Sequence, residues 1–311
     1  MSSDPLSEIL DLVNARCLLS GSLVGGGAWA RRFERPDVIK FMAVAEGRCW
    51  VIMDGLAPVG LATGDVILVN GSRSFVLTSE RTLTPEMATA TLDGMAGMIV
   101  ARDAGRDFLM IGGHVAADPK RQSILLDVLP PMIHVRSVSA EAVALNWVVD
   151  QIVREMAVDR PGAAVATAQL AQLMFVQALR AHLASAEPME EGWLKALGDE
   201  RIAPALRLMH GDPARSWTLG ELAKAVAMSR TTFALRFKTA VGVAPLAYLL
   251  GWRMRLAERD LRDSEVPVSA LARTLGYASE SAFSNAFKRT IGMAPKRYRT
   301  SSRSAGSIAL N

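Results

Sequence analysis

The chain has 311 residues, enough for about two domains, and half of them are apolar, so each domain can bury a core. The sequence has no run of about 18 apolar residues, the length that a membrane-spanning helix needs. Acidic residues precede the first apolar stretch, which is not typical of a signal peptide. Two cysteines are too few for a disulfide framework or a four-ligand zinc site. We therefore expect a cytoplasmic protein that has no membrane span and no signal peptide.

The net charge of +4 hides an asymmetry between the two parts of the chain. Residues 1–195 contain 17 Lys and Arg against 22 Asp and Glu, a balance of −5, whereas residues 196–311 contain 18 against 9, a balance of +9. A basic region joined to an acidic one indicates that the basic part binds a polyanion. The alternative is a charge pattern that only keeps the chain in solution.

Residues 16–113 are predicted to form a β-rich domain. Short runs at 38–44, 48–53 and 66–69 alternate or carry β-branched residues, and turns that contain Gly and Asp separate them. Many short strands at close spacing are typical of a sandwich or barrel. A helix over Leu6–Asn14 is expected before the first strand.

Two long helical patterns follow, from about Ala140 to Val158 and from about Ala164 to Ala184, with a Pro-Gly break between them. They predict an antiparallel hairpin whose apolar face must pack against another surface. That surface is either the β-rich domain of the same chain or a second copy of the chain. The polar segment 185–192 then marks a domain boundary.

An internal repeat is the strongest signal in the basic part. At an offset of fifty residues the chain repeats Ser229 as Ser279, Phe233 as Phe283, Phe237 as Phe287, Lys238 as Lys288, Gly242 as Gly292, and Tyr248 as Tyr298. Upstream the offset is forty-nine, so the second copy has one extra residue in its turn. Such self-similarity indicates that one supersecondary unit is used twice.

Each copy predicts a helix-turn-helix. A short helix, over Leu219–Ala225 or Val268–Leu275, leads through a turn to a serine N-cap, and a second helix with buried phenylalanines ends at a glycine. The second helix of such a motif enters the DNA major groove. A helix from Pro245 to about Arg262 joins the copies, and its length of about 27 Å suits two recognition helices about one DNA turn apart. A helical bundle that binds a protein is the alternative.

The DNA-facing residues should lie opposite the buried phenylalanines. Base edges are expected to be reached by Arg230, Thr231, Ala234 and Leu235 on the first recognition helix and by Glu280, Ser281, Ser284 and Asn285 on the second. Phosphates are expected to be held by Arg236, Lys238, Lys288 and Arg289. Asn285 can pair with adenine. Glu280 can either accept from cytosine or simply favour the start of its helix.

Residues 200–299 resemble the DNA-binding domain of the AraC/XylS family of bacterial transcription regulators. The resemblance is carried by Leu222-Ala223, Ser229-x-x-x-Phe233-x-x-x-Phe237-Lys238, Gly276-Tyr277, Ser281-x-Phe283-Ser284-x-x-Phe287-Lys288 and Gly292-x-x-Pro295-x-x-Tyr298-Arg299. Residues 4–135 more loosely resemble the cupin-like sensor domain of one branch of that family. Leu235 departs from the arginine that the family often has, and leucine cannot pair with guanine.

This resemblance implies a multidomain α+β fold, in which a cupin-like β-barrel with a helical hairpin precedes an all-α domain with two helix-turn-helix motifs. The expected parts are a sensor or effector domain (1–135), a hairpin that dimerises the chain (136–186), a linker (187–195), the DNA-binding domain (196–300) and a disordered tail (301–311). The implied function is sequence-specific, effector-responsive transcription regulation. Promoter DNA, an unidentified small molecule, RNA polymerase and a second copy of the chain are the expected partners.

Enzyme chemistry is not expected. The four histidines, His114, His134, His182 and His210, do not have the H-x-H or H-x-x-x-H spacing of a metal site, so no metal and no cofactor is predicted. A cupin enzyme fused to a DNA-binding domain is one alternative. Another is a redox-sensing regulator, because Cys17 and Cys49 each follow an arginine; buried, inert thiols are the simpler interpretation.

Overall fold

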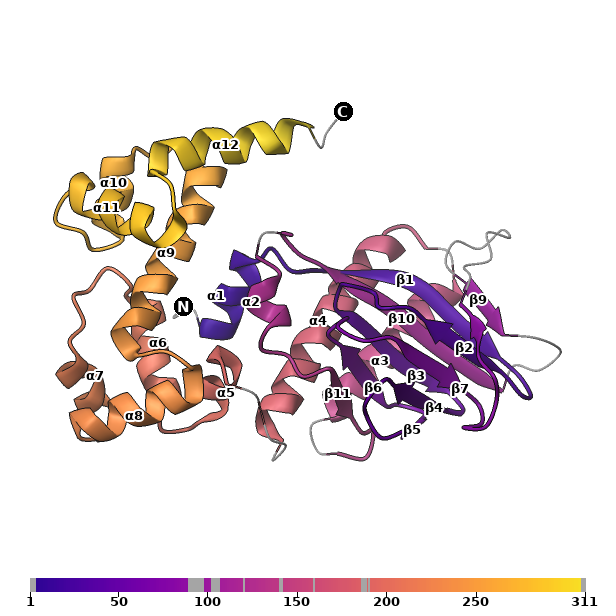
Figure 1. Ribbon diagram of the computed structural model, residues 1–311. Helices are drawn as coiled ribbons and strands as arrows, with labels where there is room; N and C mark the ends of the chain where they lie inside the picture. The colour runs from indigo at the N-terminus through magenta and orange to yellow at the C-terminus, as the bar shows by residue number, and fades with distance from the viewer. Residues whose placement is uncertain are drawn as a thin grey trace. The chain divides into compact units, whose positions relative to one another are not determined.

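The computed structural model describes residues 4–88, 98–101, 107–119, 121–139, 142–158, 160–185, 189 and 191–308 (Figure 1). The chain divides into two compact units. The β-rich unit is Val13–Glu190, and the helical unit combines Met1–Leu12 with Glu191–Asn311. The β-rich and helical characters that the sequence predicts for the two parts are confirmed.

The β-rich unit consists of two sheets that enclose an apolar core. One sheet has the strand order β11-β6-β3-β10-β1-β9 and the other has the order β5-β4-β7-β2-β8. Side chains such as Trp29, Val44, Val51 and Phe75 fill the space between the sheets. The strands are β1 (Arg16–Gly25), β2 (Ala30–Phe33), β3 (Lys40–Glu46), β4 (Arg48–Met53), β5 (Val59–Ala62), β6 (Val66–Val69), β7 (Phe75–Thr78), β8 (Glu86–Met87), β9 (Met98–Ala101), β10 (Phe108–Ala116) and β11 (Met132–Val135), with the short helix α2 (Ser123–Leu126) before β11.

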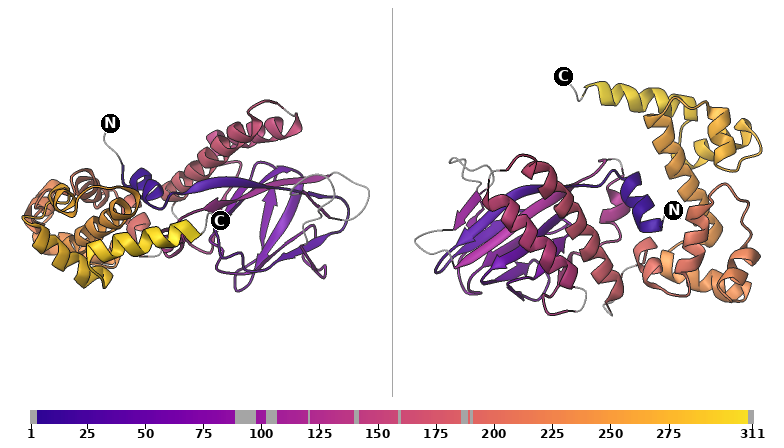
Figure 2. Two further views of the ribbon diagram at one scale, coloured as in Figure 1. Left: turned by 90° about the horizontal axis from the view of Figure 1, so that it is seen from above. Right: turned by 180° about the vertical axis from the view of Figure 1, so that it is seen from behind.

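The predicted hairpin is present as α3 (Ala142–Ala157) and α4 (Ala163–Ala184), and it covers the six-stranded sheet (Figure 2). Helix α4 contacts β1, β6 and β11, and α3 contacts β3 and α4. Phe175 and Leu179 are fully buried in this packing. One face of the hairpin therefore packs on its own domain, whereas Trp147, on α3, stays 56% exposed.

The helical unit contains nine helices within the described residues. They are α1 (Pro5–Leu12), α5 (Trp193–Gly198), α6 (Ala203–Gly211), α7 (Leu219–Ala225), α8 (Arg230–Val241), α9 (Pro245–Asp263), α10 (Val268–Thr274), α11 (Glu280–Ile291) and α12 (Pro295–Ile308). The predicted bounds of α7, α9 and α10 agree with the observed ones to within one residue.

Two features of this unit differ from the expectation. Helix α1, which we expected to be part of the sensor domain, contacts α6 and α9 and belongs to the helical unit. The reason is a long-range pairing, since Glu8 of α1 hydrogen-bonds His210 of α6. Helix α12 continues to Ile308, whereas we expected a disordered tail from residue 301.

Within the described residues, no single helix is long and apolar enough to cross a membrane. Helices α8 and α9, which meet at a 50° bend, satisfy the test only as a pair, by length and composition. Their large apolar side chains, including Phe233, Phe237 and Trp252, are buried inside the helical unit.

Candidate nucleic-acid interface

The two helix-turn-helix copies have the same start and stop signals. The Ser229 hydroxyl accepts a hydrogen bond from the Thr232 backbone N–H at 3.1 Å, and the Ser279 hydroxyl accepts one from Ala282 at 3.1 Å. Both helices have 12 residues and end at a glycine with a φ of 87°. The predicted caps are thus confirmed, and they fix the ends of both candidate recognition helices.

The repeated aromatic residues form the two matching cores. Phe233 and Phe237 of α8 are fully buried with ring centroids 5.6 Å apart, and Phe283 and Phe287 of α11 are 5.7 Å apart. The repeated tyrosines pack edge-on against the second phenylalanine of each copy, Tyr248 against Phe237 and Tyr298 against Phe287. The same side of α8 and α11 therefore faces the protein, and the opposite side of each faces outward.

The turn of the second copy depends on Gly276. This residue has a φ of 79°, and a Cβ at its position would lie 1.9 Å from the carbonyl oxygen of Ala214. In the first copy Ala227 occupies the corresponding left-handed position with a φ of 52°. Only glycine meets both the backbone angle and the close approach in the second turn.

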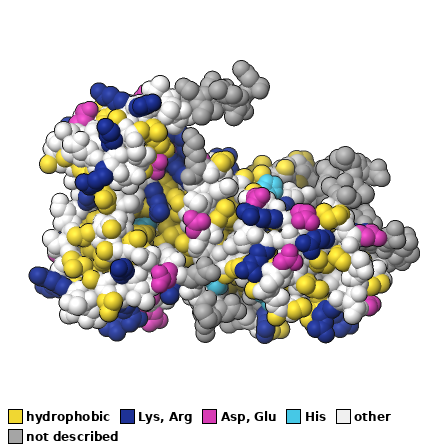
Figure 3. Space-filling model, in the orientation of Figure 1, with side chains coloured by type: hydrophobic (Ala, Val, Ile, Leu, Met, Phe, Trp, Pro, Cys, Tyr) yellow, Lys and Arg dark blue, Asp and Glu magenta, His cyan; other side chains and the backbone are white. Residues whose placement is uncertain are grey.

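The outward sides of α8 and α11 carry most of the predicted DNA-contacting residues. The exposed ones are Arg230, Thr231, Leu235, Lys238, Glu280, Ser281, Asn285, Lys288 and Arg289, and Ala234 and Ser284 are half-buried. Leu235 is 69% exposed, so its side chain is open to contact from outside the helical unit. Lys and Arg side chains are distributed over the visible surface of the helical unit (Figure 3).

Arg236 has a different environment from the other candidates. Its guanidinium forms a two-point ion pair with Asp199, with Nε–Oδ2 at 2.9 Å and Nη2–Oδ1 at 3.1 Å. Burial alone would raise the pKa of the Asp199 carboxyl, but the hydrogen bonds from Arg236 and the backbone hold this pKa below its usual value. Arg236 thus ties α8 to the residues after α5, and Lys238 is the better phosphate candidate on this helix.

Two structural residues of this unit could not be found from sequence periodicity. Arg253 of α9 donates to the carbonyl oxygens of Pro213, at 2.6 Å, and Arg215, at 2.8 Å, and so holds the loop before α7. His210 is the other, and its partners come from α1 and α9. Both roles depend on residues that are distant in the chain.

His210 lies in a closed hydrogen-bond network. Its Nδ1 is 2.8 Å from Glu8 Oε2, its Nε2 is 2.8 Å from the Tyr248 hydroxyl, and its ring stacks on Trp252 at 4.0 Å. Since the carboxylate can only accept, Nδ1–H donates to Glu8 and Nε2 accepts from Tyr248, which suits the neutral ring. Burial lowers the pKa of His210 although Glu8 opposes this shift.

The two cysteines of the β-rich unit are buried. Burial raises the pKa of the Cys17 thiol to about 12, and burial together with Asp65 raises the pKa of Cys49 to about 12. A sensor thiol needs the opposite conditions, namely exposure and a lowered pKa. Among the described residues no three His, Cys, Asp or Glu side chains are grouped to hold a metal ion.

A basic helical unit with two capped helix-turn-helix motifs, joined to a β-rich domain, defines a two-domain DNA-binding transcription regulator. Comparisons with known proteins agree. A Cupin family profile matches residues 4–184, which is more than half of the chain, and a helix-turn-helix domain profile matches residues 222–301.

Two relatives from Streptomyces match almost the whole chain. A protein of Streptomyces lividans named as an AraC-like transcription regulator is 44% identical over 95% of this chain and 98% of its own length. One of Streptomyces antibioticus with the same description is 42% identical over 95% and 98%. The crystal structure of the DNA-binding domain of AdpA with a target DNA is 31% identical and covers 33% of this chain and 93% of its own, with a TM-score of 0.32. The chain belongs to the AraC family of transcription regulators.

Proposed function

We propose that this regulator is a one-component switch: the β-rich unit binds a small-molecule effector, and the helical unit binds promoter DNA through α8 and α11. We assign sensing to 13–135, dimerisation to the hairpin 136–186, linkage to 187–195 and DNA binding to 196–300 together with α1, which the expected sensor range 1–135 had included. The observation that carries the proposal is the pair of equivalent outward faces on α8 and α11. Genome-wide footprinting of the full-length protein tests it, and one shared two-part sequence motif is the expected result.

Base reading should depend more on α11 than on α8. The outward face of α8 presents Leu235 and Ala234, which offer contacts to thymine methyl groups, whereas α11 presents the exposed Asn285 amide beside Ser284. We expect Asn285→Ala to relax the base preference at one or two operator positions, at a cost of ~1–3 kcal/mol per lost base contact. Binding to a randomised operator library measures this.

Lys288→Ala is the matched control on the same helix. This exposed cation is assigned to a phosphate, so its removal should weaken binding to all operator sequences by the same factor. If Asn285→Ala keeps the wild-type sequence profile, the assignment of base reading to Asn285 is wrong.

The outer face of the hairpin is proposed as a dimer interface. Val143 and Trp147 lie one turn apart on α3 and are 72% and 56% exposed, and Val165 of α4 is 68% exposed. Pairing two such faces would bury these side chains and would join two DNA-binding units, which raises avidity. Leu179, which is fully buried in its own domain, takes no part in this face.

Trp147→Glu is expected to give a folded monomer. The charge would be buried without a partner in the dimer but would face water in the monomer. Sedimentation at micromolar concentration should show the loss of the dimer, and affinity for a two-site operator should fall about 100-fold or more. Leu56→Glu, at an exposed apolar position in a turn of the same unit, should leave both properties unchanged. A monomeric wild-type protein, with and without operator DNA, would contradict the proposal.

The remaining parts of the proposal concern cellular role. We propose that the protein acts in the cytoplasm, where promoter DNA lies, that it works beside RNA polymerase, and that it has no enzyme activity. The support is its membership of a family of transcription regulators. A cysteine redox switch is not favoured, because both thiols are buried and their pKa is raised.

A further inference from the structure

A cavity of about 330 Å³ opens between the two sheets of the β-rich unit. Strands β1, β3 and β10 of the larger sheet and β2, β7 and β8 of the smaller one supply its walls. Cavities of this size that are lined mostly by apolar side chains, with a few polar groups, are typical of small-ligand sites. It is therefore the candidate effector site of the proposed sensor.

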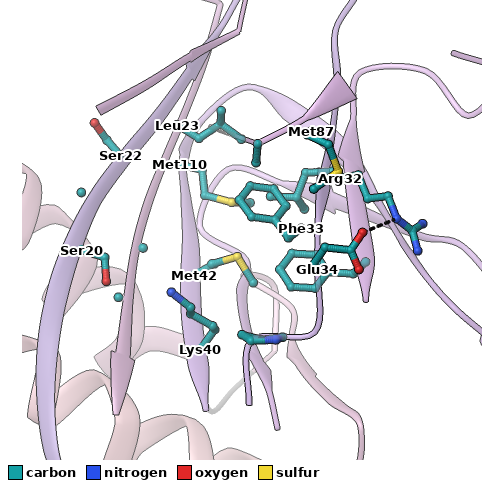
Figure 4. Close-up of a pocket in the computed structure, with 17 residues that line it drawn as sticks. Ser20, Ser22, Leu23, Arg32, Phe33, Glu34, Lys40, Met42, Met87 and Met110 are labelled. Carbon is teal, nitrogen blue, oxygen red and sulfur yellow. Dashed lines mark hydrogen bonds and ion pairs between the residues drawn. The ribbon is translucent and has the colours of Figure 1, made fainter. Parts of the chain in front are cut away.

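The body of the cavity is apolar and adaptable. Met42, Met87, Met110 and Phe33 converge in its centre, where Leu23 also lies (Figure 4). Methionine side chains are flexible and polarizable, so they adapt to ligands of different shape. This wall suits a hydrocarbon body, aliphatic or aromatic, and does not offer the many hydrogen-bonding groups that a sugar needs.

The charged groups of the cavity differ between its two ends. At one end Arg32 is held by two carboxylates, those of Glu34 at 3.2 Å and Asp54 at 3.3 Å, so its charge is already compensated. At the other end lies Lys40, whose side chain forms no hydrogen bond or ion pair with any residue that the structure describes. Among the charged residues that line the cavity, Arg32 thus pairs with Glu34, and Lys40 is left as a cation without an ion pair.

The surroundings of Lys40 favour an anion. Burial lowers the pKa of Lys40, because the ammonium is only partly hydrated. The neighbouring His114 on β10 also has a lowered pKa, owing to burial and to Lys40, which favours its neutral form and leaves Lys40 as the cation of this pair. Ser20 and Ser22 also line the wall at β1, where the Ser20 hydroxyl lies 2.8 Å from Nδ1 of His114.

We propose that this cavity binds an organic monocarboxylic acid, with the carboxylate at Lys40 and an apolar body along the methionines and Phe33. The inference rests on the proposed sensor role of the β-rich unit and specifies its ligand class. A neutral hydrocarbon would leave the Lys40 charge uncompensated, and an amine would add a second cation. A polyphosphate would require more cations than the lining provides.

Titration calorimetry on the full-length protein with octanoate, 1-octanol and octylammonium tests the ligand class. Octanoate is expected to bind about tenfold or more tightly than 1-octanol, which is the usual effect of a charged hydrogen bond, and octylammonium should not bind. Equal affinity for octanoate and 1-octanol, or tighter binding of octylammonium, would overturn the proposal.

Variants separate the two ends of the ligand. Lys40→Met should abolish the preference for octanoate over 1-octanol, whereas Lys40→Arg should retain it. Met87→Ala, at a position that is 52% exposed, should weaken both ligands by the same factor. Arg35→Met removes an equal charge from an exposed ion pair outside the cavity and should change neither. A folded Lys40→Met protein that still prefers octanoate would overturn the proposal, and if this variant does not fold, the wild-type ligand series decides.

A separate measurement distinguishes this inference from the proposed function. Operator binding is measured with and without octanoate. If octanoate binds at Lys40 but leaves operator affinity unchanged, the ligand class stands and the effector role fails. If the operator is bound but no carboxylate binds, the regulator stands and the ligand class fails.

Discussion

Raising the salt concentration from 50 to 200 mM is expected to weaken operator binding about 40-fold per chain. The exposed cations assigned to phosphates are Lys238, Lys288 and Arg289, about three contacts. Each releases a bound counterion from the DNA, so the slope of log affinity against log salt is about −0.9 per contact. Three contacts give a slope of about −2.7, and a fourfold rise in salt then costs about 40-fold.

The slope should change residue by residue. Lys238→Ala or Lys288→Ala should each reduce its magnitude by about 0.9, because one counterion fewer is released. Arg236→Ala should reduce it less, since this side chain is paired with Asp199, but it should lower the stability of the helical unit. Arg35→Ala, in the β-rich unit, is the charge-matched control. A slope near zero for the wild-type protein would show that its basic face does not meet phosphates.

The local features of the DNA-binding unit could be predicted because each is written in a short stretch of sequence. Ser229 and Ser279 accept from backbone N–H groups three residues away, and Gly242 and Gly292 end their helices in the left-handed conformation. Because these capping residues occur in both copies of the repeat, each copy strengthens the prediction of the other helix-turn-helix motif.

Features that depend on distant partners could not be predicted in this way. The basic character of Arg236 suggested a phosphate contact, but its partner Asp199 lies 37 residues away. The hairpin sequence likewise showed two apolar stretches without showing which side would meet the sheet. In the structure the apolar residues of the hairpin fall on two sides: Phe175 lies on the buried side and Trp147 on the exposed side.

The cavity proposed as the effector site shows the same limit. Lys40 belongs to an ordinary strand pattern, and nothing in its neighbours along the chain indicates a binding site. Only the pairing of β3 with β10 and the approach of β2 and β7 from the other sheet surround it with apolar side chains. The sequence also left open whether Cys17 and Cys49 are sensor thiols or inert thiols, and their burial in the structure favours inert thiols.

The N-terminal helix is expected to stabilise the DNA-binding unit through Glu8. Replacing Glu8 with alanine leaves the buried Nδ1–H of His210 without its acceptor, which should cost about 1–3 kcal/mol of unfolding free energy. Glu8→Gln keeps an acceptor oxygen at this position and should cost less. Chemical denaturation of the full-length protein, followed by its tryptophan fluorescence, measures both.

The same network makes the stability of this unit depend on pH. Burial lowers the pKa of His210 in the folded protein, so between that pKa and the unfolded value of about 6.5 the unfolded chain binds the extra proton. Stability should therefore be complete above about pH 6.5 and should fall as the pH decreases through this window. Since Glu8 opposes the lowering, Glu8→Ala should depress the pKa of His210 further and should extend the acid loss to lower pH. His210→Gln should remove this pH dependence, and a wild-type unit whose stability is the same at pH 7.5 and pH 5.5 would show that the buried ring does not titrate as we infer.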